Sequence, residues 1–259
     1  LLSRRQRQMC IRDRWIIEVK SMIKKLIINA DDFGMCEGNS LGILLAHEQG
    51  LVSSTTVMMN MPYALWALDK AKAYPNLGIG VHLTLTAGKP LLPGKKSYTD
   101  EEGNFLRPSA YEDEFPDGEP DEVYEEWKAQ IEAFIAHTGH LPTHLDSHHY
   151  VHMEHRQLEV IKRLAKEYNL PIRQTRYVDE NYFPARCEFY KDGVSFETFK
   201  EICSTEGYDT VEIVCHPALV DERLMNVSSY NMNRIKELEL LKSCLLYTSP
   251  SPRDKRQSR

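Results

Sequence analysis

The sequence lacks any long hydrophobic run. Nowhere in its 259 residues does an uninterrupted apolar stretch approach the roughly 18 residues that a transmembrane helix needs. No segment with the charge and hydrophobicity of a signal peptide precedes Met22, the methionine at which we expect the natural chain to start. These absences predict a cytoplasmic protein with no membrane partner.

Cysteine is scarce, and its spacing contains no close pair. Of the six cysteines, Cys10 and Cys244 lie near the ends of the chain, and the other four show no CxxC spacing. Secreted proteins that depend on disulfides have denser and more regular cysteine patterns. The pattern therefore argues against a disulfide scaffold and is typical of a reducing compartment.

The two ends of the chain have no periodic hydrophobic pattern. The segments LLSRRQRQMCIRDR and CLLYTSPSPRDKRQSR are rich in Arg and Ser. Such segments cannot bury enough apolar surface to offset the entropy lost on ordering. We therefore expect residues 1–14 and 244–259 to pack against nothing, and residues 1–21 and 244–259 to be non-native read-through tails. Residues 22–243 then have the size of one domain with a full core.

The body of the chain has no excess of positive charge once the two ends are set aside. The whole chain has a formal net charge of −6, while its first 14 and last 16 residues carry +4 and +3, which leaves −13 on the body. Phosphate backbones and anionic lipids repel an acidic surface. The composition therefore argues against nucleic acid or an anionic membrane as a partner.

The body of the sequence alternates short apolar runs with helical periods. The pattern predicts strands at 25–29, 54–60, 77–85, 141–149, 172–176 and 211–216, and helices at 40–50, 63–76, 121–139 and 158–168. The polar stretch 86–120 is too long for an ordinary connection and predicts a lid or substrate loop. Alternating strands and helices predict an α/β fold with a (β/α) barrel-like parallel sheet and outer helices.

Polar residues stand where the predicted strands end. Asp31 and Asp32 follow the first strand in NADDFG, His82 ends the third, and His216 ends the last. Side chains alternate along a strand, so neighbours such as Asp31 and Asp32 reach one pocket only where the backbone turns. Each residue also has an explanation without catalysis. The aspartate doublet could cap a helix, and His82 could be a buried histidine whose ring is hydrogen-bonded within the core. His216 could simply belong to the loop that begins at Pro217.

A cluster of histidines follows the fourth predicted strand. Five of the ten histidines lie within twelve residues, at positions His144, His148, His149, His152 and His155. A solvated polar loop would also explain them. However, the carboxyl ends of parallel strands converge on one edge of the sheet, where residues far apart in sequence meet.

One carboxylate and two imidazoles suit Zn²⁺ and related divalent ions, and three protein ligands leave a position open for water. A second carboxylate can then accept a proton, while a histidine opposite can protonate a leaving nitrogen. The residue types at the strand ends therefore favour a metal-dependent hydrolase.

The motifs resemble those of a known family. NADDFG, STT, GVHLTLTAGKPL, THLDSHHYVH and CHPA occur in this order and spacing, and they are similar to those of the YdjC/ChbG-like carbohydrate deacetylases, which remove N-acetyl groups from chitooligosaccharides. The likeness extends over nearly all of residues 22–242. Because family members continue beyond this point, the resemblance implies a (β/α) barrel-like fold that is incomplete at its C-terminus.

The resemblance also implies roles for individual residues. In this family a Mg²⁺ or Zn²⁺ ion is held by residues that correspond to Asp32, His82 and His148, with the base at Asp31 and the acid at His216. Its substrate would be a small acetylated oligosaccharide such as diacetylchitobiose. We expect three further residues to surround the site: Asp146 would orient a ligand histidine, and His149 and His152 would lie at the rim of the cleft or against a neighbouring helix.

Two other functions are compatible with parts of this pattern. An amidohydrolase or phosphoesterase could use the same ligand types, but an amidohydrolase is expected to show an HxH pair where this chain has Asp31 and Asp32. A non-catalytic sugar- or metal-binding protein would need neither Asp31 beside Asp32 nor His216. The oligomeric state is not decided by the sequence, and a homo-oligomer is compatible with it.

Overall fold

The computed structural model describes residue 23 and residues 25–95, 97–107, 118–174 and 184–248. The predicted start at Met22 and the predicted tails lie outside these residues, apart from residues 244–248. Those five residues continue the last helix past the predicted boundary at Ser243. The domain boundary therefore stays a prediction.

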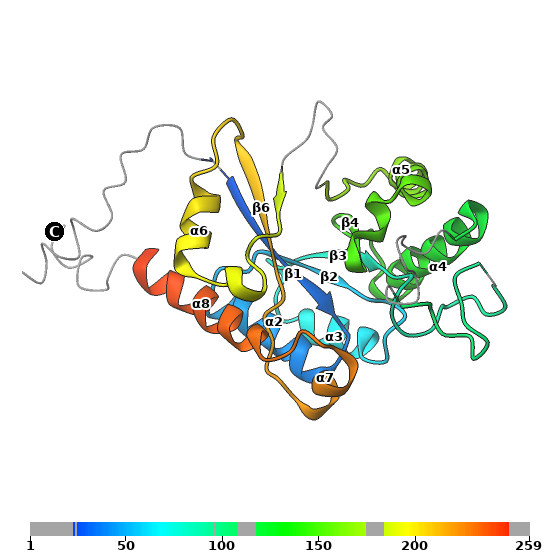
Figure 1. Cartoon of the computed structure of the whole chain (residues 1–259), viewed down its shortest axis with the longest axis horizontal. Helices are drawn as coiled ribbons and strands as arrows, with labels where there is room; N and C mark the ends of the chain where they lie inside the picture. The colour runs from blue at the N-terminus through cyan, green and yellow to red at the C-terminus, as the bar shows by residue number, and fades with distance from the viewer. Residues whose placement is uncertain (1–22, 24, 96, 108–117, 175–183, 249–259) are drawn as a thin grey trace, which may run out of the picture.

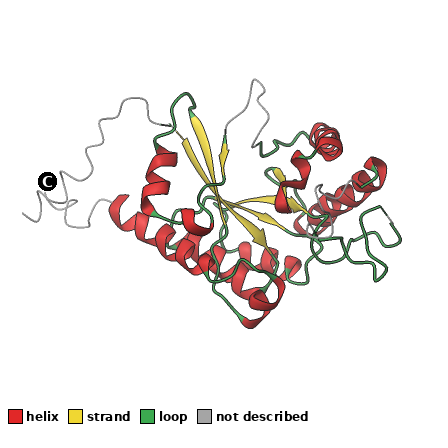
Figure 2. Ribbon diagram, viewed as in Figure 1, coloured by secondary structure: helices red, strands yellow, loops and turns green. Residues whose placement is uncertain are grey.

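The described strands form one parallel sheet with the order β4-β3-β2-β1-β6-β5. The sheet curls strongly, with helices around its outside (Figures 1 and 2). The strands are β1 (Lys25–Phe33), β2 (Ser54–Val57), β3 (Gly78–Leu83), β4 (Leu145–Ser147), β5 (Ala185–Arg186) and β6 (Thr210–Cys215). The predicted α/β class with a barrel-like, incomplete parallel sheet and outer helices is confirmed.

The connections between strands are mostly helical, as expected of parallel neighbours. The α-helices are α2 (Glu37–Glu48), α3 (Ala64–Ala71), α4 (Pro120–Thr138), α5 (His155–Tyr168), α6 (Phe196–Cys203), α7 (Glu222–Val227) and α8 (Asn233–Thr248), with short 3₁₀ segments η2 (His148–Met153) and η3 (Lys191–Gly193). Sequence patterns predicted α2, α3, α4 and α5, whereas α6, α7, η2, η3 and β5 were not predicted. No helix in the described part of the chain is both long and apolar enough to cross a membrane.

The strand predicted at 172–176 is reduced to a short link. Ile172 forms an isolated parallel bridge with Leu145 of β4, and the Gln174 carbonyl accepts a hydrogen bond from Ala185 of β5 (3.3 Å). Residues 175 and 176 lie outside the described residues. This link joins the two edges of the curled sheet and carries Arg173 between them.

The polar stretch 86–120 runs without regular structure as far as it is described, apart from one antiparallel bridge between Thr99 and Phe105. Tyr98 and Phe105 are buried in the main core. This anchoring shows that part of the stretch belongs to the packed body, and its use as a lid or substrate loop stays a prediction.

Helix α4 packs as its sequence period predicts. Val123, Trp127, Ile131 and Phe134 recur at helical spacing and are all fully buried. The helix ends at Gly139, whose φ of +78° is a left-handed conformation that glycine adopts without strain.

Helix α2 buries small residues beside its large apolar ones. Leu41 is 37% exposed, while the buried face contains Gly38 and Gly42 together with Ile43 and Leu44. The glycines face the segment that follows β6. A Cβ added at Gly42 would lie 2.4 Å from both the Ala218 Cα and the Leu219 nitrogen, and the Leu219 N–H donates to the Gly38 carbonyl at 3.0 Å. Small residues on α2 thus hold the segment that begins at His216.

We expect Gly42→Ala to lower the free energy of unfolding by about 1–3 kcal/mol, because the new methyl group collides with backbone atoms. This would outweigh the higher helix propensity of alanine. Urea unfolding measures the effect. Gly78→Ala is the control, because its nearest neighbour would be 3.5 Å away. Equal stability of the two variants would contradict the prediction.

Candidate metal and catalytic site

The aspartate doublet lies inside β1 and not after its end. The strand was predicted to end at Asn29, but it continues to Phe33, and its pairing with β2 shifts in register between Ala30 and Phe33. Asp32 has a φ of +72°, which is uncommon for a residue with a side chain and tolerated best by Asn and Asp. This local bulge breaks the alternation of side chains, so both carboxylates reach the same buried region.

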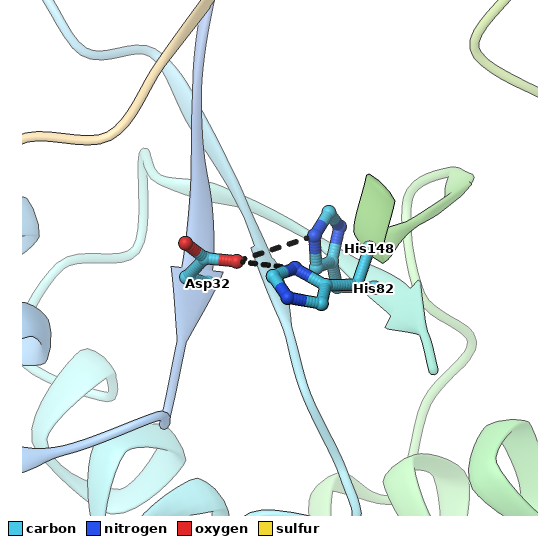
Figure 3. Close-up of side chains that lie close together, drawn as sticks. All are labelled: Asp32, His82 and His148. Atoms are coloured by element: carbon cyan, nitrogen blue, oxygen red, sulfur yellow. Dashed lines mark ion pairs between the residues drawn. The ribbon is translucent and has the colours of Figure 1, made fainter. Parts of the chain in front are cut away.

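Three of the predicted site residues lie together at the carboxyl-end edge of the sheet (Figure 3). The Asp32 Oδ1 atom lies 3.0 Å from His148 Nδ1 and 3.4 Å from His82 Nε2. One ligand atom from each residue falls within 4.8 Å of the other two. The side chains of Asp32 and His82 are buried, and that of His148 is 13% exposed.

The two oxygens of Asp32 have different surroundings. Oδ2 accepts a hydrogen bond of 2.7 Å from Nη2 of Arg234 on α8. Oδ1 is buried and has no hydrogen-bond partner of acceptable geometry among the described residues. Burial would raise the pKa of Asp32, but Arg234 and His148 outweigh it and hold that pKa well below its usual range. The side chain is therefore an anion with one oxygen left for a further ligand.

A contact at Nδ1 orients the ring of His82. Its Nδ1 lies 2.7 Å from Asp146 Oδ1, and Thr56 of the STT motif donates to Asp146 Oδ2 at 3.0 Å. With Nδ1 occupied in this way, Nε2 faces Asp32. Burial would lower the pKa of His82, but Asp146 and Asp31 raise it to about 10. The surrounding carboxylates thus favour positive charge at this position.

Asp31 is held by a buried arginine. Arg173 donates from Nη1 to Asp31 Oδ2 and from Nη2 to Asp31 Oδ1, each at 2.7 Å. Asn29, the first residue of NADDFG, donates to Asp31 Oδ1 at 2.9 Å. Asp31 Oδ2 lies 3.9 Å from His82 Nε2. The carboxylate is therefore fixed next to the group formed by Asp32, His82 and His148, without belonging to that group.

The same arginine contacts two more carboxylates. Arg173 lies 2.8 Å from Asp146 Oδ2 and 2.8 Å from Glu212 Oε1, and its side chain is fully buried. Burial would raise the pKa of Asp146, but Arg173 and His82 lower it. Burial raises the pKa of Glu212 to about 7 despite Arg173. One cation thus serves carboxylates from β1, β4 and β6.

The histidines that follow β4 lie in different environments. His149 stacks on His148 with ring centroids 3.8 Å apart, and its Nδ1 lies 2.9 Å from Thr86 Oγ1. His149 is exposed, and its place at the rim of the cleft stays a prediction. His152 is fully buried, with one ring nitrogen 2.6 Å from Ser147 Oγ and the other 2.9 Å from the Arg173 carbonyl. His152 therefore does not lie at the rim, because both of its ring nitrogens are used inside the fold.

His216 stands at the end of β6 beside two tyrosines. Its ring centroid lies 5.5 Å from that of Tyr190 and 5.7 Å from that of Tyr230, and its side chain is 17% exposed. Burial lowers its pKa to about 4, although Asp31 and Asp32 act in the opposite direction. Among the contacts of the described residues, none joins His216 directly to Asp32, His82 or His148.

The sequence analysis missed four charged residues that contact the site, namely Arg173, Glu212, Arg234 and Glu237. A signal was present for two of them. Glu212 interrupts the apolar run VEIVC and Arg173 stands inside the strand predicted at 172–176, and charges are almost never buried without a partner. Arg234 and Glu237 lie in a helical stretch with several other charged residues, and charged residues usually face solvent, so nothing in the sequence distinguished them.

The residues present fit a divalent metal ion. Asp32 offers a buried carboxylate oxygen without a hydrogen-bond partner among the described residues, and His82 and His148 direct ring nitrogens to the same place. A carboxylate with two imidazoles is a common ligand set for such ions, and Asp146 supplies the usual support behind a ligand histidine. Asp31, His82 and Asp146 also lie close together, but Arg173 already neutralises the two carboxylates of that set.

A barrel-like parallel sheet with a buried Asp-His-His group at its carboxyl-end edge is typical of a metal-assisted hydrolase. The sequence matches the profile of the YdjC-like protein family over residues 25–246, and the chain belongs to that family. The resemblance found in the motifs is confirmed.

Similar proteins agree with this assignment. A carbohydrate deacetylase from Halalkalibacterium halodurans is 42% identical over 225 residues, which cover 84% of this chain and 94% of that protein. One from Enterococcus faecalis is 42% identical over 243 residues, which cover 85% and 90%. The expectation of an enzyme, a hydrolase of the carbohydrate deacetylase group, is confirmed.

A solved structure from Enterococcus faecalis V583 is also similar. It is described as that of a candidate cellobiose-phosphate cleavage protein, and it shares 40% sequence identity with this chain at a TM-score of 0.78. The likeness covers 85% of this chain and 91% of that one. The curled parallel sheet is thus shared with an experimentally determined relative.

We expect Arg173→Met to lower the free energy of unfolding by about 3–5 kcal/mol near neutral pH, because it leaves buried carboxylates without their cation. Arg173 lowers the pKa of Asp146, so this stabilisation is present above the unfolded-state pKa and is lost as the pH falls. The difference between variant and wild type should therefore shrink in acid, and chemical denaturation at several pH values measures it.

The matched control is Arg163→Met. Its guanidinium is exposed and lies 3.8 Å from Asp121, a geometry with little effect on stability. If Arg173→Met unfolds at the same denaturant concentration as Arg163→Met, the carboxylates do not depend on Arg173.

Proposed function

We propose that this protein is a metal-dependent deacetylase that removes N-acetyl groups from small acetylated oligosaccharides such as diacetylchitobiose. The observation that carries the proposal is the buried Oδ1 of Asp32, which accepts no hydrogen bond from the described residues and faces nitrogen atoms of His82 and His148. The relatives named carbohydrate deacetylases support the substrate class. The reaction adds water to the acetamide carbonyl carbon, breaks the C–N bond, and yields acetate and the sugar amine.

Asp32, His82 and His148 would hold the ion, with Zn²⁺ and Mg²⁺ as the candidates. When bound, a divalent ion polarises a carbonyl group and lowers the pKa of water. The residues behind the ligands orient them. Asp146 keeps His82 Nε2 directed at the site, and Arg234 holds Asp32 Oδ2 so that Oδ1 is presented.

Asp31 would act as the base that takes a proton from the attacking water. Its Oδ2 lies 3.9 Å from His82 Nε2, next to the proposed ligands. Arg173 fixes the carboxylate through both oxygens, which sets its direction before substrate binds. The doublet thus divides two tasks between neighbours, with Asp32 as ligand and Asp31 as base.

His216 would donate a proton to the departing sugar nitrogen. Its ring is partly exposed, as a group that meets substrate must be, and it stands at the same edge of the sheet as Asp31. General acid catalysis of this kind typically contributes about 10²–10⁴-fold. His149 lies beside His148 on the exposed side and could contact the substrate.

The rival functions have less support. The place where an amidohydrolase would carry an HxH pair holds Asp31 and Asp32. A protein that only bound sugar or metal would have no use for a second carboxylate fixed beside the ligand set. The arrangement of Asp31 on Arg173 therefore favours catalysis.

Removing the metal should abolish the activity. We expect the full chain to release acetate from diacetylchitobiose, to lose that release after treatment with a chelator, and to regain it with one divalent ion. Titration with Zn²⁺ and Mg²⁺ separately identifies which ion restores it. Full acetate release by protein that contains no metal by elemental analysis would contradict the proposal.

The two aspartates should respond differently to substitution. We expect Asp32→Asn to lose both metal and activity, because it removes the charged ligand oxygen. Asp31→Asn should keep its metal while turnover falls by roughly 10²-fold or more, because it removes only the base. Metal content measured beside acetate release distinguishes these outcomes.

The variant His216→Ala tests the proposed general acid. It should keep its metal and lose turnover, as Asp31→Asn does. If Asp31→Asn loses its metal as completely as Asp32→Asn, the doublet is a shared ligand pair and the assignment of Asp31 as base is wrong.

A further inference from the structure

Helix α8 carries a second buried charge that the proposed reaction does not yet use. Arg234 and Glu237 are one helical turn apart on α8, and both side chains are buried. Arg234 reaches Asp32, whereas Glu237 reaches His216. One turn of a single helix thus contacts both a proposed ligand and the proposed acid.

Glu237 contacts His216 in two ways. Its Oε2 accepts a hydrogen bond from the His216 backbone N–H. Its Oε1 lies 4.0 Å from His216 Nδ1 and accepts a hydrogen bond from the Tyr230 hydroxyl. His216 Nδ1 is buried and has no hydrogen-bond partner of acceptable geometry among the described residues. The carboxylate of Glu237 therefore binds the backbone of His216 and also lies beside the Nδ1 atom of the same residue.

We propose that Glu237 is a positioning residue for His216, holding the backbone from which the imidazole extends and placing a negative charge beside Nδ1. This inference rests on the proposed role of His216 as the acid. With Nδ1 facing the carboxylate, Nε2 is the nitrogen that gives its proton to the leaving amine. The carboxylate stabilises the ring while it carries that proton.

Burial moves both groups toward their neutral forms. Burial raises the pKa of Glu237 to about 7 and lowers that of His216 to about 4. Two such neighbours bind protons as a pair, so a pH profile reports the pair and not either group alone. Loss of the carboxylate would leave the buried imidazole as a weaker base.

Other charged and titratable groups also face this pair, and none of them is altered by the test below. They come from β1, β3, β6, the 3₁₀ segment η2, helix α8, the residue before η3 and the loop after α7, and they are Asp31, Asp32, His82, Cys215, His149, Arg234, Tyr190 and Tyr230.

The test compares Glu237→Gln with wild type in the full chain. Glutamine keeps the size of the side chain and an acceptor oxygen but removes the charge. We expect the pKa of His216, followed by NMR and assigned with His216→Ala, to fall by about 1 unit or more. The alkaline limb of the kcat profile for acetate release should move to lower pH by a similar amount, with KM little changed.

Two further variants separate positioning from general stability. Glu239→Gln is the matched control, because Glu239 lies on the same helix with its side chain 67% exposed and pairs with Lys242 at 3.2 Å. It should change neither the pKa of His216 nor the profile. Glu237→Asp restores the charge and should return the alkaline limb toward that of wild type.

The outcomes distinguish this inference from the proposed function. If the pKa of His216 is the same in Glu237→Gln as in wild type, the inference is overturned, whatever happens to turnover or stability. If that pKa falls but wild type releases no acetate, Glu237 does position His216 and the proposed deacetylation is wrong. If Glu237→Gln still lowers turnover in a His216→Ala background, the carboxylate acts independently of His216 and the inference fails.

Discussion

The arrangement of the site depends on the buried guanidinium of Arg173. It contacts carboxylates from three separate strands, Asp31 of β1, Asp146 of β4 and Glu212 of β6. Without a cation between them, these anions would repel one another and pay the cost of leaving water. The link that carries Arg173 also contacts both β4 and β5, so the neutralising charge and a connection between the two edges of the sheet come from the same short segment.

A second cation, Arg234, acts in the same way at the neighbouring carboxylate. It takes Oδ2 of Asp32 and leaves Oδ1 to face His82 and His148. The two halves of the doublet therefore have different arginines, and this difference gives each aspartate its own environment. Asp31 accepts a hydrogen bond from Arg173 on each oxygen, whereas Oδ1 of Asp32 has no hydrogen-bond partner among the described residues. The proposed division of labour between adjacent residues rests on this asymmetry.

The carboxyl-end edge of the sheet is held by packing as well as by charge. Small residues on α2 allow the segment after β6 to approach closely, while α8 contacts the backbone of His216 through Glu237 and the side chain of Asp32 through Arg234. Buried polar residues of this kind cost stability unless every partner is present. Their concentration at one edge of an otherwise apolar core is what a preorganised catalytic site requires.

The sequence by itself determined the alternation of strands and helices, the family, and the residue types at the strand ends. These are local properties, because hydrophobic periods and short motifs depend on neighbours along the chain. Only the tertiary structure decided how Asp31 and Asp32 reach one region, through a bulge with a positive φ at Asp32 inside a strand expected to end earlier. It also decided which charges are buried together. Arg173 lies 142 residues from Asp31 and Arg234 lies 202 residues from Asp32, and no local pattern records a contact made by chain segments so far apart.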